Sequence, residues 1–327
     1  MKAQVLHRVG EPLVFEERPL PEPSGLQVRI KVAACGLCLT DKHIIDGELP
    51  PKKSPLIPGH QIVGRIDKLG KDVTKFAIGD LVGVTWLHKT CGKCSYCESG
   101  QENLCEKALF TGYDVDGGFA EYVTAESDYL IPLPEGHDLA SLAPLLCAGL
   151  IGYRSYKLSG IKPKQKLGLI GFGGSAHLVI QIARYYQCDV YVFTRTEEHQ
   201  KLSLELGAKW AGTSNDHPKE LLDAAILFAP NGELVKQGLD LLKRGGKLVI
   251  NAIHMSDIPK MPYDTIYHEK ILQSATNVTR EDAKEFIELA ISIPIYVKMT
   301  KCPLSDANRA IKDLKESKIN GSLVFIP

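Results

Sequence analysis

The sequence predicts an α/β protein with two domains, one mostly β and one built on a doubly wound parallel sheet. Before Cys147, short apolar runs are separated by glycine and proline turns, which is typical of β-strands. After Cys147, strand-like runs alternate with helical periodicity, and this alternation predicts a parallel sheet with helices on both faces. A chain of 327 residues is also long enough for about two domains.

The expected elements follow in chain order. The clearest strands of the first domain cover 27–32, 62–69 and 79–84, after a proline-rich turn at 19–23. In the second domain we expect strands at 167–170, 190–193, 224–228, 246–251 and 270–275, with helices at 177–186 and 233–242. Thr194-x-x-Glu197 is typical of a capping box that opens a further helix, which Gly207 ends. The tail 295–327 reads as a strand, a helix at 304–316 and a strand.

The balance of charges excludes some partners. Lys plus Arg and Asp plus Glu both number 39, so no net positive field would attract a nucleic acid. No run approaches the roughly 18 apolar residues of a membrane span, and the polar N-terminus does not resemble a signal peptide. We therefore expect a cytoplasmic protein without nucleic-acid or membrane partners.

Three soft ligands indicate a catalytic metal. Cys38 and His60 lie some twenty residues apart, and Cys147 follows much later in Leu-Leu-Cys-Ala-Gly. Two thiolates and one neutral imidazole leave the fourth position of a tetrahedral zinc open, which is the arrangement of catalytic zinc. The sequence therefore predicts a metal enzyme.

A second group of thiols indicates a structural metal. Four cysteines lie within fifteen residues on a loop that contains Gly and Ser: Cys91, Cys94, Cys97 and Cys105. Four thiolates complete a closed tetrahedral shell with no position for substrate, so we assign them a structural zinc. The alternative is four unligated thiols, which would be exposed to oxidation. Clusters of this kind in a cytoplasmic chain favour metal binding over disulfides.

The turn after the strand at 167–170 predicts a dinucleotide site. Gly171-x-Gly173-x-x-Ala176 lies between a strand and a helix, which is the context that supports this motif. Glycines allow the backbone to approach a pyrophosphate, and the helix N-terminus offers N–H groups to it. The cofactor residues assigned here are Gly171, Gly173, Gly174, Ser175 and Ala176. A glycine turn without a ligand is the alternative.

The end of the next strand bears on the choice of cofactor. An acidic residue there would bind the ribose 2′-hydroxyl of NAD, but this chain has Thr194 and Arg195. A guanidinium can bind a 2′-phosphate through two hydrogen bonds, so NADP is expected. The alternative is that Arg195 is a surface residue and that NAD binds without the acid.

These motifs together resemble a known family. The run Cys35-Gly36-Leu37-Cys38, the pair Gly59-His60, the four-cysteine loop and the 171–176 turn are similar to the zinc-containing alcohol dehydrogenases of the medium-chain dehydrogenase/reductase superfamily. The resemblance covers essentially the whole chain. It implies a GroES-like catalytic domain at 1–148 and 290–327, with a zinc loop at about 88–108. It also implies a Rossmann domain at 149–289 and two zinc ions per chain.

The resemblance implies roles for three residues near Cys38. Zinc would lower the pKa of a bound alcohol, whose hydride then passes to the nicotinamide ring. Thr40 and His43 match the hydroxyl and the histidine of the family's proton relay; a surface histidine is the alternative for His43. Asp41 is expected to orient His60, or else to cap a turn or helix.

Two departures from the family pattern stand out. Gln61 follows His60 where family members usually carry Glu, so we expect intact zinc binding with altered ligand exchange or rate. In Asn320-Gly321-Ser322, the serine replaces an arginine that helps to hold the cofactor phosphates, which puts that contact in doubt.

Trp86 and Leu49 match segments that line the substrate pocket in the family. A bulky indole near zinc would favour unbranched primary alcohols and aldehydes, although a core tryptophan is equally consistent with the sequence. The resulting prediction is a zinc-dependent alcohol dehydrogenase or aldehyde reductase that uses NADP(H), as a homodimer or homotetramer. The alternatives are a polyol or sugar dehydrogenase of the same superfamily and a non-catalytic zinc-binding interaction module.

Overall fold

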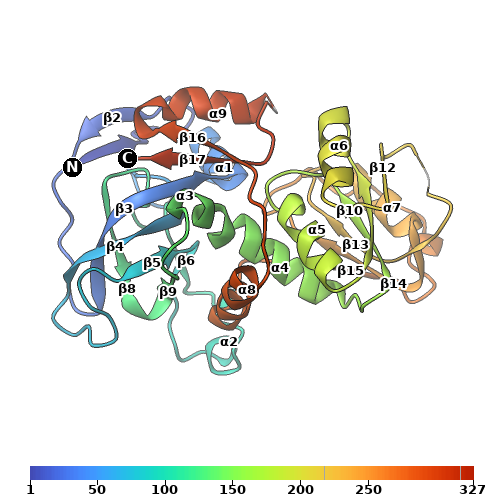
Figure 1. Ribbon diagram of the computed structural model, residues 1–327, viewed down its shortest axis with the longest axis horizontal. Helices are drawn as coiled ribbons and strands as arrows, with labels where there is room; N and C mark the ends of the chain where they lie inside the picture. Colours follow the sequence, from blue (N-terminus) through green and yellow to red (C-terminus); the bar gives the residue numbers. More distant parts are fainter. Residues whose placement is uncertain (217, 317) are drawn as a thin grey trace. The chain divides into compact units, whose positions relative to one another are not determined.

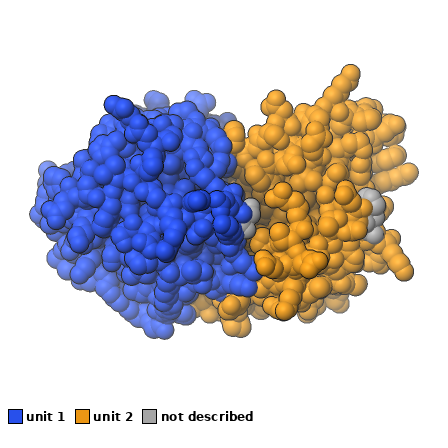
Figure 2. Space-filling model, turned by 90° about the horizontal axis from the view of Figure 1, so that it is seen from above, with its two compact units in different colours: residues 1–147, 277–288, 297–327 blue, residues 148–276, 289–296 orange. Residues whose placement is uncertain are grey.

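The computed structural model describes residues 1–216, 218–316 and 318–327, which form two compact units (Figures 1 and 2). Unit 1 comprises Met1–Cys147, Asn277–Glu288 and Val297–Pro327, and unit 2 comprises Ala148–Thr276 and Leu289–Tyr296. The sequence assigned 149–289 to the second domain and 290–327 to the first, whereas the structure groups Asn277–Glu288 with unit 1 and Leu289–Tyr296 with unit 2. Helix α8 (Arg280–Ser292) begins in unit 1, where the backbone N–H of Arg280 donates to the Glu102 carboxylate at 2.8 Å.

Unit 1 is built on a mostly antiparallel sheet in the order β16-β17-β3-β4-β5-β9, with β8 also paired to β3. Strand β3 is the longest, and its N-terminal half pairs with β8 while its C-terminal end pairs with β17. The strands of this sheet are β3 (Gln27–Leu37), β4 (Gln61–Leu69), β5 (Leu81–Val84), β8 (Tyr122–Glu126), β9 (Ile131–Pro132), β16 (Met299–Pro303) and β17 (Ser322–Ile326). Two small pairs accompany it, β1 (Lys2–Val5) with β2 (Val14–Glu17) and β6 (Leu87–Lys89) with β7 (Leu109–Phe110).

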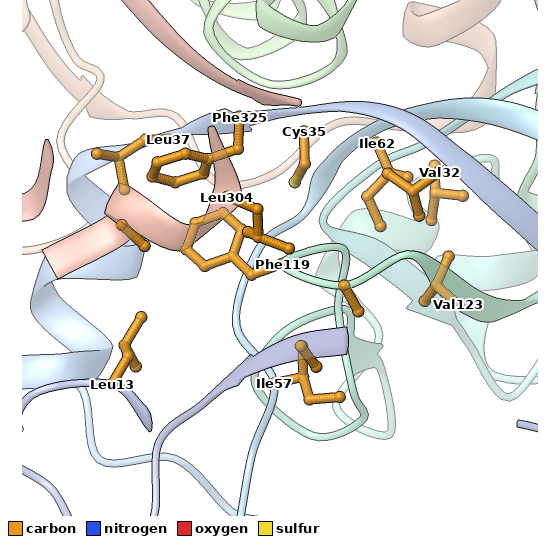
Figure 3. Packing of buried hydrophobic residues seen from close by; sticks show 14 of the residues in the cluster. Leu13, Val32, Cys35, Leu37, Ile57, Ile62, Phe119, Val123, Leu304 and Phe325 are labelled. Carbon is orange, nitrogen blue, oxygen red and sulfur yellow. The ribbon is translucent and has the colours of Figure 1, made fainter. Parts of the chain in front are cut away.

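The core of unit 1 joins segments from both ends of the chain. The rings of Phe119 and Phe325 meet edge to face with centroids 4.9 Å apart, and both side chains are fully buried (Figure 3). Cys35 lies in the same cluster, where burial raises the pKa of its thiol well above the usual value. This thiol is therefore a core group and differs from the cysteines that gather near His60.

Unit 2 is a parallel sheet in the order β12-β11-β10-β13-β14-β15. Numbered within the unit, this order is 3-2-1-4-5-6, which is the Rossmann arrangement. The predicted α/β class with a doubly wound sheet is thus confirmed. The strands are β10 (Lys166–Ile170), β11 (Asp189–Phe193), β12 (Trp210–Gly212), β13 (Leu222–Leu227), β14 (Leu242–Ile250) and β15 (Ile271–Ser274). The helices wholly within this unit are α4 (Ala148–Ser159), α5 (Ala176–Tyr185), α6 (Glu197–Glu205) and α7 (Glu233–Asp240).

The N-termini of helices α6 and α5 differ in side-chain capping. Helix α6 begins at Glu197 and is capped by Thr196, whose hydroxyl accepts the N–H of His199, so the capping box expected from Thr194 is wrong by two residues. Helix α5 begins at Ala176, and Ser175 supplies no side-chain cap to it. No side chain of Ser175 thus occupies the N-terminus of α5, where the N–H groups of His177 and Leu178 donate to the carbonyls of Gly173 and Ser175 at 3.1 Å.

The remaining helices belong to unit 1. They are α1 (Leu39–Asp46), α2 (Ser95–Glu98), α3 (Leu139–Leu142) and α9 (Ala307–Lys315). The sequence analysis expected α9 but none of the other three, which are short and carry little helical periodicity. Across the described residues, none of the helices combines the length and the apolar character needed to cross a bilayer.

Candidate functional site

The site begins at the N-terminus of α1. Cys38 is the N-cap residue, and its sulfur accepts the backbone N–H of Thr40 at 3.5 Å. Asp41 completes a capping box, because its Oδ2 accepts the backbone N–H of Cys38 at 2.9 Å. The positive end of the helix dipole favours a thiolate at this position. The sequence Cys-x-Thr-Asp thus places an activated sulfur at a fixed point.

His60 and Cys147 converge on this sulfur. The Sγ atoms of Cys38 and Cys147 are 4.0 Å apart, and Nε2 of His60 is 3.3 Å from Sγ of Cys147. All three donor atoms lie within 4.8 Å of one another. Tetrahedral zinc with bonds of about 2.3 Å to sulfur requires sulfur atoms about 3.8 Å apart. The donor set and its spacing therefore fit a zinc ion with one position left for an exogenous ligand.

Asp41 also sets the orientation of His60. Its Oδ1 lies 3.2 Å from Nδ1 of His60 and accepts the backbone N–H of Gly59 at 3.2 Å. Gly59 has φ 97°, and a Cβ there would lie 2.4 Å from the ring of Phe119, so only glycine fits. A carboxylate at Nδ1 leaves Nε2 as the nitrogen that faces the sulfurs.

In the metal-free protein, neighbouring groups shift the pKa of each of the three donors. Burial lowers the pKa of His60, but Asp41 and then the Cys38 thiolate outweigh burial and raise this pKa to about 10. The interaction between Cys38 and Cys147 holds the pKa of the Cys38 thiol well below its usual value. The same interaction raises the pKa of the Cys147 thiol well above its usual value. A bound dication would replace these protons, because each donor must be deprotonated to bind a metal.

The four cysteines of the 88–108 loop form a second, closed set of donors. The Sγ atom of Cys97 lies 3.9 Å from that of Cys91 and 3.5 Å from that of Cys94, and the four sulfurs, including Cys105, lie within 4.8 Å of one another. A backbone N–H of Lys93 lowers the pKa of Cys91 to about 6. All nine cysteines of the chain are free thiols. This set fits a tetrahedral all-thiolate zinc.

The glycine turn of unit 2 lies between β10 and α5. Gly171 has φ 89°, and a Cβ there would lie 2.8 Å from the backbone nitrogen of Ala229. At Gly173, by contrast, a Cβ would meet only open space, so the backbone is accessible there. Thr194 is buried and Arg195 exposed directly after β11. A pyrophosphate against α5 and a ribose near the end of β11 would fit this arrangement.

The family can now be stated from comparisons with known proteins. Two family models match the chain, "Alcohol dehydrogenase GroES-like domain" over residues 24–135 and "Zinc-binding dehydrogenase" over residues 174–292. A probable alcohol dehydrogenase, AdhA, of Mycobacterium tuberculosis is 43% identical over 94% of this chain and 90% of its own length. The chain belongs to the zinc-containing alcohol dehydrogenase family. The predicted resemblance is thus confirmed.

Further relatives of this alcohol dehydrogenase family agree. An alcohol dehydrogenase of Geobacillus stearothermophilus is 35% identical over 99% of this chain and 98% of its own length. Among solved structures, a CAD from Helicobacter pylori complexed with NADP(H) is 27% identical, with a TM-score of 0.91 over 99% of this chain and 97% of that one. Sequence and fold relationships therefore extend over both units.

The two residues expected to line a substrate pocket lie close to His60 or to His43. The indole of Trp86 meets the ring of His60 edge on, with centroids 5.1 Å apart, and stacks on Phe110. The backbone N–H of Leu49 donates to the carbonyl of His43 at 3.0 Å. Both side chains are half-buried at the edge of the core of unit 1.

Among the departures from the family pattern, Gln61 is the first residue of β4 and is buried. A Cβ at Gly36 would lie 2.6 Å from its amide oxygen, so the Gln61 side chain lies against β3. Ser322 begins β17 and is also buried. Neither position supplies the charge that the alcohol dehydrogenase pattern usually has there.

Sequence reasoning missed Glu48. Its carboxylate accepts a hydrogen bond at Nδ1 of His43, and Lys42 contacts the same carboxylate at 2.6 Å. The available signal was Gly47, which has φ 81° and ends α1, because a left-handed residue after a helix reverses the chain. The carboxylate of the residue after that glycine, Glu48, therefore lies against the last turn of α1, which contains His43.

Proposed function

We propose that this protein is a zinc-dependent dehydrogenase that interconverts primary alcohols and aldehydes with NADP(H). The proposal rests chiefly on one observation: two sulfurs and one imidazole nitrogen, from Cys38, His60 and Cys147, converge within 4.8 Å and provide three ligands to a metal that needs four. Membership of the alcohol dehydrogenase family supports the redox chemistry. The abundance of free thiols fits a reducing, cytoplasmic compartment.

The protein's own groups divide the remaining work. Zinc held by these three residues supplies Lewis acidity toward the substrate oxygen. Asp41 keeps His60 in the ligand orientation through the contact at Nδ1. We assign a structural zinc to Cys91, Cys94, Cys97 and Cys105, whose closed set leaves no position for substrate.

A proton must leave the site when an alcohol is oxidised. Thr40 is buried and its hydroxyl lies 3.6 Å from Sγ of Cys38, which supports a position near the substrate oxygen. His43 lies one helical turn further along α1. We assign Thr40 as the first carrier of the proton and His43 as the base that receives it.

For the cofactor, the turn formed by Gly171, Gly173, Gly174, Ser175 and Ala176 would receive the pyrophosphate. Thr194 and Arg195 replace the acidic residue that favours NAD, and the exposed guanidinium suits a 2′-phosphate. The Helicobacter pylori relative was solved with NADP(H), which supports the same preference.

For the substrate, the stacked pair Trp86 and Phe110 forms a flat aromatic wall beside His60. Such a wall would favour an unbranched chain over a second substituent on the carbinol carbon. Leu49 adds an apolar contact on the side of His43. Primary alcohols and aldehydes are therefore the expected substrates.

The test is a panel of straight-chain, branched and aromatic aldehydes, each assayed with NADPH and with NADH on protein of measured zinc content. We expect kcat/KM to be highest with NADPH and unbranched or aromatic primary aldehydes. Polyols and sugars in the same assay provide the comparison, since a higher rate with sorbitol than with every primary alcohol would make the enzyme a polyol dehydrogenase. Light scattering then distinguishes a dimer from a tetramer.

A further inference from the structure

The turn after α1 brings a carboxylate onto the proposed relay histidine. Gly47 ends the helix, and the backbone N–H of Leu49 donates to the carbonyl of His43 at 3.0 Å, so the segment 47–49 folds back. This fold places Oε2 of Glu48 in a hydrogen bond with Nδ1 of His43. The His43 side chain is 8% exposed and that of Glu48 37%, so Glu48 lies on the solvent side of the ring.

Lys42 keeps this carboxylate ionised. Its Nζ lies 2.6 Å from Oε1 of Glu48, and the contacts with Lys42 and then His43 lower the pKa of Glu48 to about 2. A carboxylate that is ionised at every physiological pH can only accept hydrogen bonds. The nitrogen of His43 that faces it must therefore carry a proton, which makes Nε2 the basic nitrogen of the neutral ring.

We propose that Glu48 is a positioning residue of the proton relay: it accepts the Nδ1 proton of His43, fixes the ring and its tautomer, and presents Nε2 to the proton that arrives through Thr40. This inference rests on the proposed alcohol dehydrogenase function. A proton bound at Nε2 gives an imidazolium beside the Glu48 carboxylate. The same proton then passes to water, which restores the neutral ring in its original tautomer.

The charges around Glu48 are balanced. Lys42 also contacts Asp46 at 3.3 Å, and Asp46 contacts Lys315 of α9 at 2.5 Å. Two carboxylates and two ammonium groups leave this cluster with no net charge. Lys42 and His43 thus contact the same carboxylate, which orients the imidazole through the hydrogen bond at Nδ1.

The kinetic test compares Glu48→Gln with Asp46→Asn. Both variants remove a carboxylate from Lys42, but only Glu48 of the two also bonds to the ring of His43, so the comparison isolates that hydrogen bond. We expect Glu48→Gln to lower kcat for alcohol oxidation about tenfold to a hundredfold, with KM and zinc content within about twofold of the parent. Asp46→Asn should stay near the parent rate. Glu48→Asp, which keeps the charge, should recover most of the loss.

A double variant separates this inference from the proposed function. With His43→Ala as background, Glu48→Gln should cause no further loss, because it acts only through the ring. Full activity of His43→Ala would overturn both the relay and the role of Glu48. A large loss in His43→Ala with full activity in Glu48→Gln would overturn the role of Glu48 alone.

A measurement on the unaltered enzyme covers the case in which Glu48→Gln does not fold. The ¹⁵N chemical shifts of His43, assigned by their loss in His43→Ala, report the tautomer directly. We expect a protonated Nδ1 and an unprotonated Nε2 above the pH at which the ring loses its charge. A protonated Nε2 there would contradict the inference.

Discussion

The carboxylate of Asp41 holds His60 and Cys38 at the same time. One oxygen lies 3.2 Å from Nδ1 of His60, and the other accepts the backbone N–H of Cys38 at 2.9 Å. Asp41 is completely buried. A single side chain thus places two of the three candidate zinc ligands, and the same side chain caps α1. Changes at Asp41 should therefore act on the metal before they act on the substrate.

The first prediction follows directly. Asp41→Asn should weaken binding of the catalytic zinc about tenfold to a hundredfold, because the group that orients a ligating histidine loses its charge. Chelator competition, followed by metal analysis, measures the affinity. Asp46→Asn on the same helix is the control, since that carboxylate pairs with Lys42 and Lys315 at the surface. Equal zinc affinities in the two variants would show that Asp41 has no role in holding the metal.

The second prediction concerns pH. In the metal-free protein, Asp41 and the Cys38 thiolate raise the pKa of His60 to about 10, so at neutral pH zinc must displace a proton from the ring. Zinc affinity should therefore rise about tenfold per pH unit or more between pH ~6.5 and pH ~10. The raised pKa also stabilises the folded metal-free protein fully below pH ~6.5, and this contribution is lost as pH rises toward 10.

Isothermal titration of the metal-free enzyme in buffers of different ionisation enthalpy measures the protons released. At least one proton per catalytic zinc is expected at pH ~7. Asp41→Asn should lower the His60 pKa and reduce that number, because the main attraction that outweighs burial is removed. Zinc binding without any proton release at this pH would contradict the interpretation of His60.

The third prediction separates the two metal sets. Cys94→Ser should reduce the zinc content by one ion and leave the set of Cys38 unaffected, since the two groups of donor residues have no member in common. A structural metal contributes folding free energy, so the midpoint of thermal unfolding should fall by about 10 °C. Ser99→Ala, on the same loop, is the control. Retention of both ions in Cys94→Ser would argue against a structural site.

These features differ in how far the sequence reveals them. The donors Cys38, His60 and Cys147 can be chosen from residue type and neighbouring glycines, because a chemical requirement marks them. The contact between Glu48 and His43 depends on the left-handed Gly47, and no periodicity signals it. The same limit explains α1, whose eight residues are too few for an apolar repeat.

Non-local packing sets a second limit. The segment Asn277–Glu288 belongs with unit 1, where Arg280 meets the buried carboxylate of Glu102, which is 178 positions away in the chain. No local property of α8 records that partner. The prediction of cap positions has the same limit on a smaller scale, since Thr194 and Thr196 are both residues that suit an N-cap and the structure uses Thr196.

The fourth prediction concerns cofactor choice. Arg195→Ala should raise KM for NADPH about tenfold to a hundredfold and leave KM for NADH nearly unchanged, because only NADPH has a 2′-phosphate for the guanidinium. Lys201→Ala removes another exposed charge, on α6, and serves as the control. Equal changes in KM for NADPH and for NADH would mean that Arg195 does not contact the 2′-phosphate. The preference for NADP over NAD would then lose its support.

The last prediction concerns the aromatic wall. The ring centroid of Trp86 lies 5.1 Å from that of His60, and Trp86 stacks on Phe110 at an interplanar angle of 15°, so a smaller residue would open space beside the candidate zinc ligands. Trp86→Leu keeps the position apolar. We expect kcat/KM for secondary alcohols to rise about tenfold relative to primary alcohols, since a substituent of one or two carbons is worth about 1–3 kcal/mol in a fitted pocket.

Phe110→Leu is the matched control, because it loosens the same stack without changing the ring that meets His60. If Trp86 limits the substrate, the two variants should differ: Phe110→Leu should keep the preference for primary alcohols, and Trp86→Leu should lose it. An equal shift in both variants would indicate general loosening of the cluster. No shift in either would assign Trp86 to core packing, and substrate selection would then depend on other residues.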